Sequence, residues 1–92
     1  MKIRFREQAR ADIRDIHSHV FQWSPEGSID ISREIYAVCR LIGEHPFSAP
    51  ETSDPFVRVK HLIRFPYKIF YIVGKNAIEI IHIRHTSRRE WV

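Results

Sequence analysis

The chain has 92 residues, of which 43% are hydrophobic and 12% aromatic, and its net charge is +4 at pH 7. This length and composition exclude a disordered chain and favour one globular domain that spans residues 1–92. A single cysteine, Cys39, excludes an internal disulfide, and no signal-like or membrane-length apolar run is present, so we expect a cytoplasmic protein without membrane contact.

Charge is distributed unevenly along the chain. Residues 1–56 hold seven Lys or Arg and nine Asp or Glu, which gives −2, whereas residues 57–92 hold eight and two, which gives +6. The first part is therefore expected to be an ordinary solvated scaffold. The second part is expected to carry the positive field, which suits a nucleic acid or an acidic protein as partner.

The first elements are predicted from a change of period. Residues 2–5 alternate between charged and apolar side chains and predict a short, half-buried strand. From Glu7 the apolar positions follow the spacing i, i+4, i+7, i+11 of one helix face. These positions are Ala9, Ile13, Ile16 and Val20. The polar positions outside this stripe, expected in solvent, are Asp12, Arg14, Asp15 and Ser18.

A second helix is predicted to begin at Ser24-Pro25, because Ser suits the N-cap and Pro the first helical position. Its apolar stripe has the same spacing as the first and consists of Ile31, Ile35, Val38 and Ile42. Gly43 and Pro46 end it. Two helices with one apolar stripe each form a helical hairpin that needs a sheet to lie on.

After a loop at 47–55, strands are predicted at 56–62, 67–73 and 77–85, with a turn at 74–76. The expected fold is α+β, with the order β-α-α-β-β-β and the helical hairpin packed on a mainly antiparallel four-stranded sheet. The side chains expected to face the helices from 67–73 are Tyr67, Ile69, Tyr71 and Val73. Lys68 then lies on the open face with Phe70 and Ile72, an apolar patch that a partner would cover.

Metal and cofactor chemistry are not expected. His17 and His19 differ by two on a helix, and His82 and His85 differ by three on a strand, so neither spacing brings two imidazoles together. Cys39 lies beside the apolar stripe of the second helix and is interpreted as a buried structural thiol.

The remaining reactive side chains are basic. No phosphate-binding loop, nucleophile elbow or carboxylate pair is present, and Glu79 is expected to be solvated or ion-paired. Basic side chains alone suit the cleavage of RNA by its own 2′-hydroxyl, which needs a base, an acid and cations for the phosphorane charge. The candidates are Arg58, Lys60, Arg64, Lys68, Arg84, His85, Arg88 and Arg89. The alternative for each is a solvated or structural side chain.

Five segments then resemble one family over nearly the whole chain. They are the Ala-x-x-Asp-Ile-x-x-Ile pattern at 9–16, His-Pro-Phe at 45–47, Val-Arg at 57–58, Pro-Tyr-Lys-Ile-Phe-Tyr-Ile-Val at 66–73, and Ile-Arg-His-Thr-Ser-Arg at 83–88 followed by Trp91. In this order and spacing they resemble the ParE/RelE superfamily of small bacterial toxins from type II toxin–antitoxin systems. The resemblance implies the same β-α-α-β-β-β fold and a cognate antitoxin that covers the open face in a hetero-oligomer.

The resemblance leaves two activities open. His85-x-x-Arg88 followed by Trp91 is similar to the closing motif of the ParE branch, whose members poison DNA gyrase, and implies target contacts through Arg84, Arg89 and Trp91. RelE-like relatives instead cleave mRNA on the ribosome. That reading implies a metal-independent endoribonuclease whose catalytic residues are His85, Arg88, Lys68, Arg64 and Arg58. A third hypothesis is a plain nucleic-acid-binding module or an inactive relative.

Overall fold

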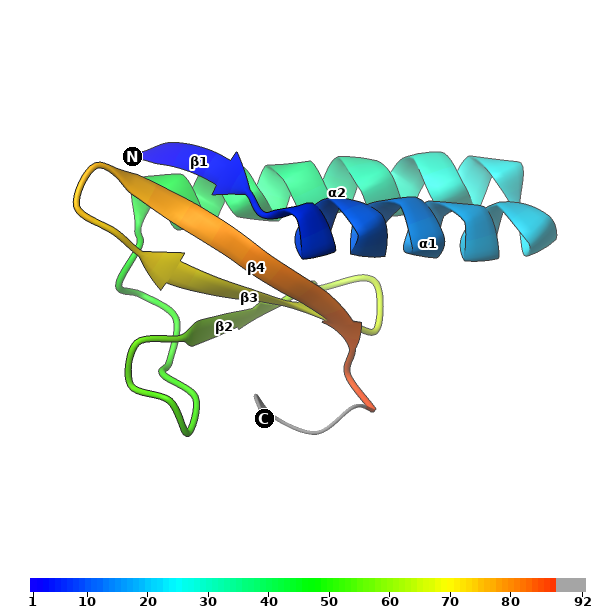
Figure 1. Ribbon diagram of the computed structural model, residues 1–92. Helices are drawn as coiled ribbons and strands as arrows, with labels where there is room; N and C mark the ends of the chain where they lie inside the picture. The colour runs from blue at the N-terminus through cyan, green and yellow to red at the C-terminus, as the bar shows by residue number, and fades with distance from the viewer. Residues whose placement is uncertain (88–92) are drawn as a thin grey trace.

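The computed structural model describes residues 1–87, in which two helices lie over one face of a four-stranded sheet (Figure 1). The elements are β1 (Lys2–Phe5), α1 (Glu7–Trp23), α2 (Pro25–Glu44), β2 (Arg58–His61), β3 (Tyr67–Val73) and β4 (Ala77–His85). The predicted order and α+β class are confirmed. Only the strand expected at 56–62 is shorter than predicted.

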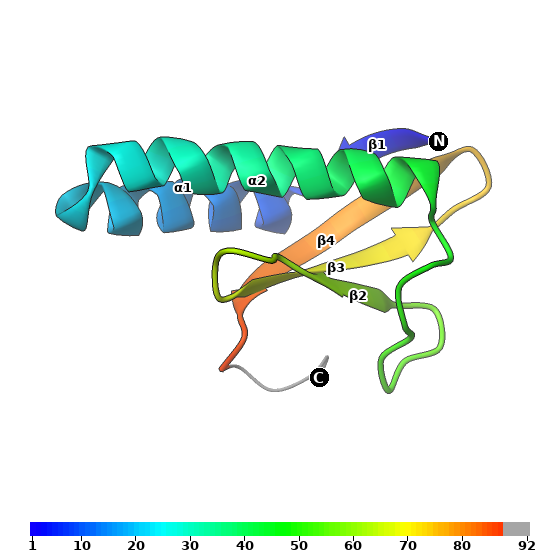
Figure 2. The same cartoon turned by 180° about the vertical axis from the view of Figure 1, so that it is seen from behind.

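The strand order in the sheet is β1-β4-β3-β2, and the two ends of β4 have different neighbours. β1 runs parallel to β4 and pairs with it only from Ala77 to Ile80, whereas the other two strand pairs are antiparallel. Pairing stops where the amide of Arg6 donates to the carbonyl of Ile80 at 2.9 Å. Within residues 1–87, the edge of β4 beyond Ile80 therefore has no strand beside it, and α1 packs there instead. From behind, α2 lies in front of α1, and both helices lie on the same side of the sheet (Figure 2).

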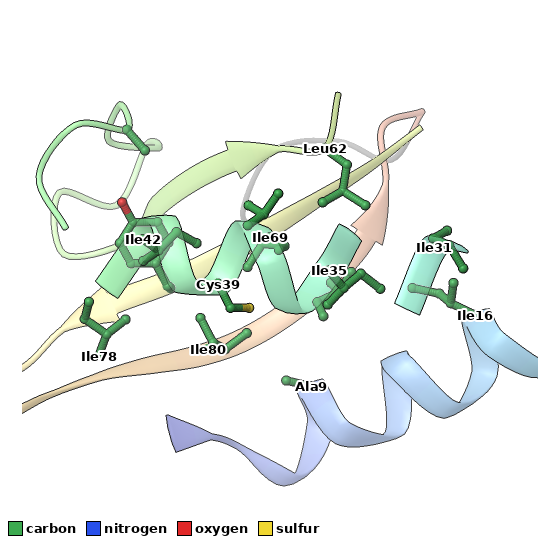
Figure 3. Close-up of a cluster of buried hydrophobic side chains, with 14 residues drawn as sticks. Ala9, Ile16, Ile31, Ile35, Cys39, Ile42, Leu62, Ile69, Ile78 and Ile80 are labelled. Atoms are coloured by element: carbon green, nitrogen blue, oxygen red, sulfur yellow. The ribbon is translucent and has the colours of Figure 1, made fainter. Parts of the chain in front are cut away.

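The main core lies between the hairpin and the sheet (Figure 3). Each predicted helix stripe contributes to it, with Ala9 and Ile31 fully buried. The sheet meets them with Ile69 and Tyr71, so the prediction that this side of β3 faces the helices is confirmed. The second helix begins as predicted, since the Ser24 hydroxyl accepts a hydrogen bond from the amide of Gly27 at 2.9 Å.

A β-bulge explains why isoleucines stand on both sides of β4. Tyr71 pairs with Ile80 and Phe70 pairs with His82, so Ile81 is an extra residue in the ladder. The bulge returns Ile83 to the helix-facing core although it follows Ile80 by three residues. Strict alternation along the sequence therefore could not have predicted which face of the sheet the residues after Ile80 occupy.

The sheet face away from the helices is covered within the chain. A second apolar cluster joins Val57, Val59, Phe70 and Ile81, and Phe70 is fully buried. Lys68 lies on this face as its parity predicted, but only 4% of it is exposed. The prediction of an open apolar patch around Phe70 was wrong, because parity along one strand does not include the side chains that neighbouring strands supply.

Cys39 is buried in the main core, and burial raises the pKa of its thiol from 9.0 to about 12. We expect almost no reaction with iodoacetamide at pH 8 in the folded protein and full reaction in denaturant, because the thiolate is the nucleophile. Mass spectrometry of the alkylated product measures both. The unfolding free energy should also fall as pH rises from about 9 to about 12, since the unfolded thiol ionises first. Rapid labelling of the native chain would contradict this.

Candidate functional site

A cleft of about 430 Å³ runs along the free edge of β4, between this strand and α1. Its lining residues are Asp12, Asp15, Ile16, Tyr67, His82, Ile83, Arg84 and His85. His82 and His85 come from opposite sides of the strand by their pairing, yet both reach the cleft because it follows the strand edge. It therefore gathers carboxylate, imidazole and guanidinium groups from two elements.

Asp12 takes the place of a strand at this edge. One oxygen, Oδ2, accepts hydrogen bonds from the backbone amide of Ile83 at 2.9 Å and from Nδ1 of His82 at 2.5 Å. The other, Oδ1, accepts a hydrogen bond from Nε2 of the Gln8 side chain at 2.9 Å. The side chain of Asp12 is only 11% exposed, so the prediction that it lies in solvent was wrong. The physical reason is the short β1, which leaves the amide of Ile83 in need of an acceptor.

His82 connects Asp12 to Arg84. Its Nε2 lies 3.1 Å from Nη2 of Arg84. A guanidinium can only donate, so Nε2 accepts and the imidazole proton resides on Nδ1, directed at Asp12. We call the chain of Asp12, His82 and Arg84 the edge relay.

His85 holds the opposite tautomer. Its Nδ1 accepts from the backbone amide of Ser87 at 3.1 Å and lies 2.8 Å from the Ser87 hydroxyl. The proton therefore resides on Nε2, which leaves an N–H donor for a ligand. The ring meets Tyr67 edge to face, with 5.4 Å between ring centroids. His85 can thus hydrogen-bond an anionic or carbonyl group without losing its own anchor.

The structure brings together some of the predicted site residues. Lys68 and Arg84 are directly paired across β3 and β4 and share the face away from the helices. Arg84 and His85 line the cleft. The predicted residues Arg88, Arg89 and Trp91 lie outside the described residues.

Two predicted catalytic arginines lie elsewhere. Arg64 stands at the β2–β3 turn, where its guanidinium is 3.8 Å from the carboxylate of Glu34 in α2. Arg58 donates to the carbonyl of Ala49 at 2.6 Å and lies over the ring of Phe47, 5.1 Å from its centre. Arg58 therefore anchors a neighbouring loop, whereas Arg64, whose side chain is 64% exposed, is held by ion pairs with α2 at 3.8 Å.

A second surface, which sequence reasoning missed, lies on the outer side of the hairpin. Two adjoining hollows of about 570 and 300 Å³ share His17, Ser32 and Tyr36. We call this surface the hairpin groove. Its lining residues are Ile13, Arg14, His17, Ser18, Ile29, Ser32, Arg33, Tyr36, Ala37 and Arg40. None of these is acidic, although the first 56 residues carry a net charge of −2.

The second helix, α2, contributes to the hairpin groove through a second stripe. The stripe on α2 is Ile29, Arg33, Tyr36 and Arg40, which repeats the i, i+4, i+7, i+11 spacing of the buried stripe. Tyr36 is 52% exposed and Ile29 is 50% exposed. This periodicity was the available signal for the surface. The net charge of the segment did not reveal this surface, because it sums over all side chains, whereas no acidic side chain lines the groove itself.

Residues 1–87 contain neither a cluster of three possible metal ligands nor a helix able to cross a membrane. No three His, Cys, Asp or Glu side chains in this part of the chain are close enough to hold a metal ion. Neither α1 nor α2 combines the length and apolar character that a bilayer span needs.

Comparisons with known proteins give one family and a solved structure of the same fold. A family model described as the ParE toxin of the type II toxin–antitoxin system parDE matches residues 3–90. A solved structure described as the chromosomal ParDE TA system from P. aeruginosa superposes with a TM-score of 0.81 and 22% identity, covering 92% of this chain and 95% of that chain. No curated protein matches significantly.

Proposed function

Because the chain belongs to the ParE toxin family of type II toxin–antitoxin systems, we propose that it arrests growth by inhibiting DNA gyrase in the cytoplasm and is neutralised by a cognate antitoxin. The family match over residues 3–90 is the observation that carries this proposal. The basic groups at the end of β4, the half-buried Arg84 and the exposed His85, support a binding activity, with Arg84 as the described candidate for target contact.

The dispersed arginines favour binding over catalysis. An endoribonuclease needs its base, acid and cations around one phosphate. Arg58 instead donates to a loop carbonyl, and Arg64 lies beside carboxylates of α2, so the two are not gathered at the cleft. One observation favours mRNA cleavage as the second candidate function: His85, with its proton on Nε2, lines the same cleft as Arg84.

A supercoiling assay tests the target. Purified toxin is expected to inhibit DNA supercoiling by gyrase at a concentration at which the heat-unfolded chain has no effect. Transcripts from cells that express the toxin, examined by primer extension, should remain intact. Normal supercoiling at saturating toxin would contradict gyrase as the target, and codon-positioned cuts would establish the second candidate function.

The antitoxin is proposed to contribute an acidic amphipathic helix that lies in the hairpin groove. A groove between two antiparallel helices accepts a third helix by packing ridges into grooves. The exposed Ile29 and Tyr36 offer apolar contacts, while Arg14, Arg33 and Arg40 call for acidic side chains on the partner. The apolar share of the surface favours a protein helix over a nucleic acid backbone.

The size of the hairpin groove also suits a helix. The exposed stripe from Ile29 to Arg40 extends about 16 Å, which corresponds to about three helical turns. Neither Arg33 nor Arg40 forms an ion pair with another side chain of residues 1–87. Their charges are therefore available to a partner without the loss of an internal contact.

A further inference from the structure

The edge relay contains two residues that the proposed function does not use. Arg84 is the candidate for target contact, whereas Asp12 and His82 lie behind it. The relay crosses from α1 to the last strand, so it connects the orientation of the half-buried guanidinium of Arg84 to the packing of the hairpin.

We propose that Asp12 and His82 are positioning residues that hold the guanidinium of Arg84 in the orientation used to bind the target. This inference rests on the proposed function. An arginine side chain loses considerable rotamer freedom when it binds, and orienting it beforehand reduces that loss. The relay contributes to this orientation through the hydrogen bond from Nη2 of Arg84 to Nε2 of His82 at 3.1 Å.

The far end of the relay is fixed by the fold. The carboxylate of Asp12 is held by the amide of Ile83 and by the side chain of Gln8, each at 2.9 Å. Its hydrogen bond with Nδ1 of His82 sets both the tautomer and the angle of the imidazole ring. Nε2 consequently faces Arg84 as an acceptor.

Two amide substitutions at position 82 separate positioning from stability. The side-chain amide of asparagine reaches approximately as far as Nδ1, so His82→Asn keeps the donor to Asp12 and removes the acceptor for Arg84. The longer glutamine reaches approximately as far as Nε2, so His82→Gln keeps the acceptor for Arg84 and removes the donor to Asp12. If His82 had only a structural role, the protein would lose the most stability in His82→Gln. The His82→Asn variant would then keep the full inhibitory activity of each folded molecule.

We expect His82→Asn to inhibit gyrase about tenfold more weakly than the wild type, because Arg84 must then lose rotamer freedom when it binds and the affinity falls. Inhibition by His82→Gln should stay within about twofold of the wild type. The concentration of folded toxin for half-maximal inhibition of supercoiling measures this. A second readout does not depend on gyrase: in NMR spectra, the guanidinium of Arg84 should rotate about its Nε–Cζ bond faster in His82→Asn than in His82→Gln.

Several results would overturn the inference. Equal inhibition by the two variants would do so, as would inhibition that follows melting temperature, or a rotation rate of Arg84 that is unchanged in His82→Asn. If His82→Asn does not fold, Asp12→Asn provides the same comparison, since its weaker acceptor should speed the rotation of Arg84. If the wild type itself leaves gyrase unaffected while Arg84 rotates faster in His82→Asn, the proposed target fails and the orienting role of His82 stands.

Discussion

Replacing Asp12 with alanine is expected to lower the unfolding free energy by about 3 kcal/mol, because hydrogen bonds to a charged group contribute about 1.5–3 kcal/mol each. The substitution leaves the amide of Ile83 and Nδ1 of His82 without their acceptor at a partly buried strand edge. It also separates α1 from the end of β4. Urea unfolding followed by circular dichroism measures the loss, and the melting temperature should fall by more than about 10 °C.

Asp15→Ala is the matched control. Asp15 is exposed, follows Asp12 by three residues on the same helix and lines the same cleft, but it makes no hydrogen bond or ion pair within residues 1–87. Its loss should change stability by less than about 0.5 kcal/mol. Equal destabilisation by the two substitutions would show that Asp12 acts through general charge or helix propensity and not through the contacts at the strand edge.

Local signals were sufficient to predict most of the fold. The second helix begins after Ser24 because its hydroxyl caps the first turn, and this requires only neighbouring residues. The strands Tyr67–Val73 and Ala77–His85 have the predicted bounds, since β-branched and aromatic runs around a short turn specify a hairpin by themselves. The burial of Tyr71 also followed from alternation along one strand.

The predictions that were wrong concerned residues whose surroundings depend on two or more elements together. The side chain of Asp12 is largely buried because β1 is shorter than β4. The periodicity within α1 contains no information about the relative lengths of these two strands. The bulge at Ile81 likewise exists only in the register between β3 and β4. Phe70 is covered by Val57 and Val59 of the loop and strand beside it, so its burial depends on tertiary packing.

The candidate site was predicted only in part for the same reason. Lys68 lies on the predicted face, but its pairing with Arg84 follows from the register between β3 and β4, which the sequence does not specify. Arg58 and Arg64 are directed toward a loop and a helix whose positions the sequence does not specify either. The hairpin groove was missed because a net charge averages over a segment. Arg33 and Arg40 line the hairpin groove, which no carboxylate lines, although Arg33 also borders a neighbouring hollow with Asp30 and Glu34.

Reversing the charge of the hairpin groove with Arg33→Glu and Arg40→Glu together is expected to weaken antitoxin binding by about 100-fold or more, because like charges oppose each other across an interface. Cells that express this variant should stop growing even when the antitoxin, taken as the small protein encoded by the adjacent reading frame, is co-expressed. Calorimetric titration of the purified pair measures the affinity.

The matched control is Lys2→Glu with Lys75→Glu. It makes the same change in net charge at two exposed positions, one on β1 and one in the β3–β4 turn, both outside the hairpin groove. The control should lose affinity for the antitoxin by no more than about threefold, the share due to long-range attraction. Because the groove variant keeps the end of β4 unchanged, it should still inhibit gyrase. Full neutralisation of the groove variant by the antitoxin would place the antitoxin on another surface. An equal loss of affinity in the control variant would lead to the same conclusion.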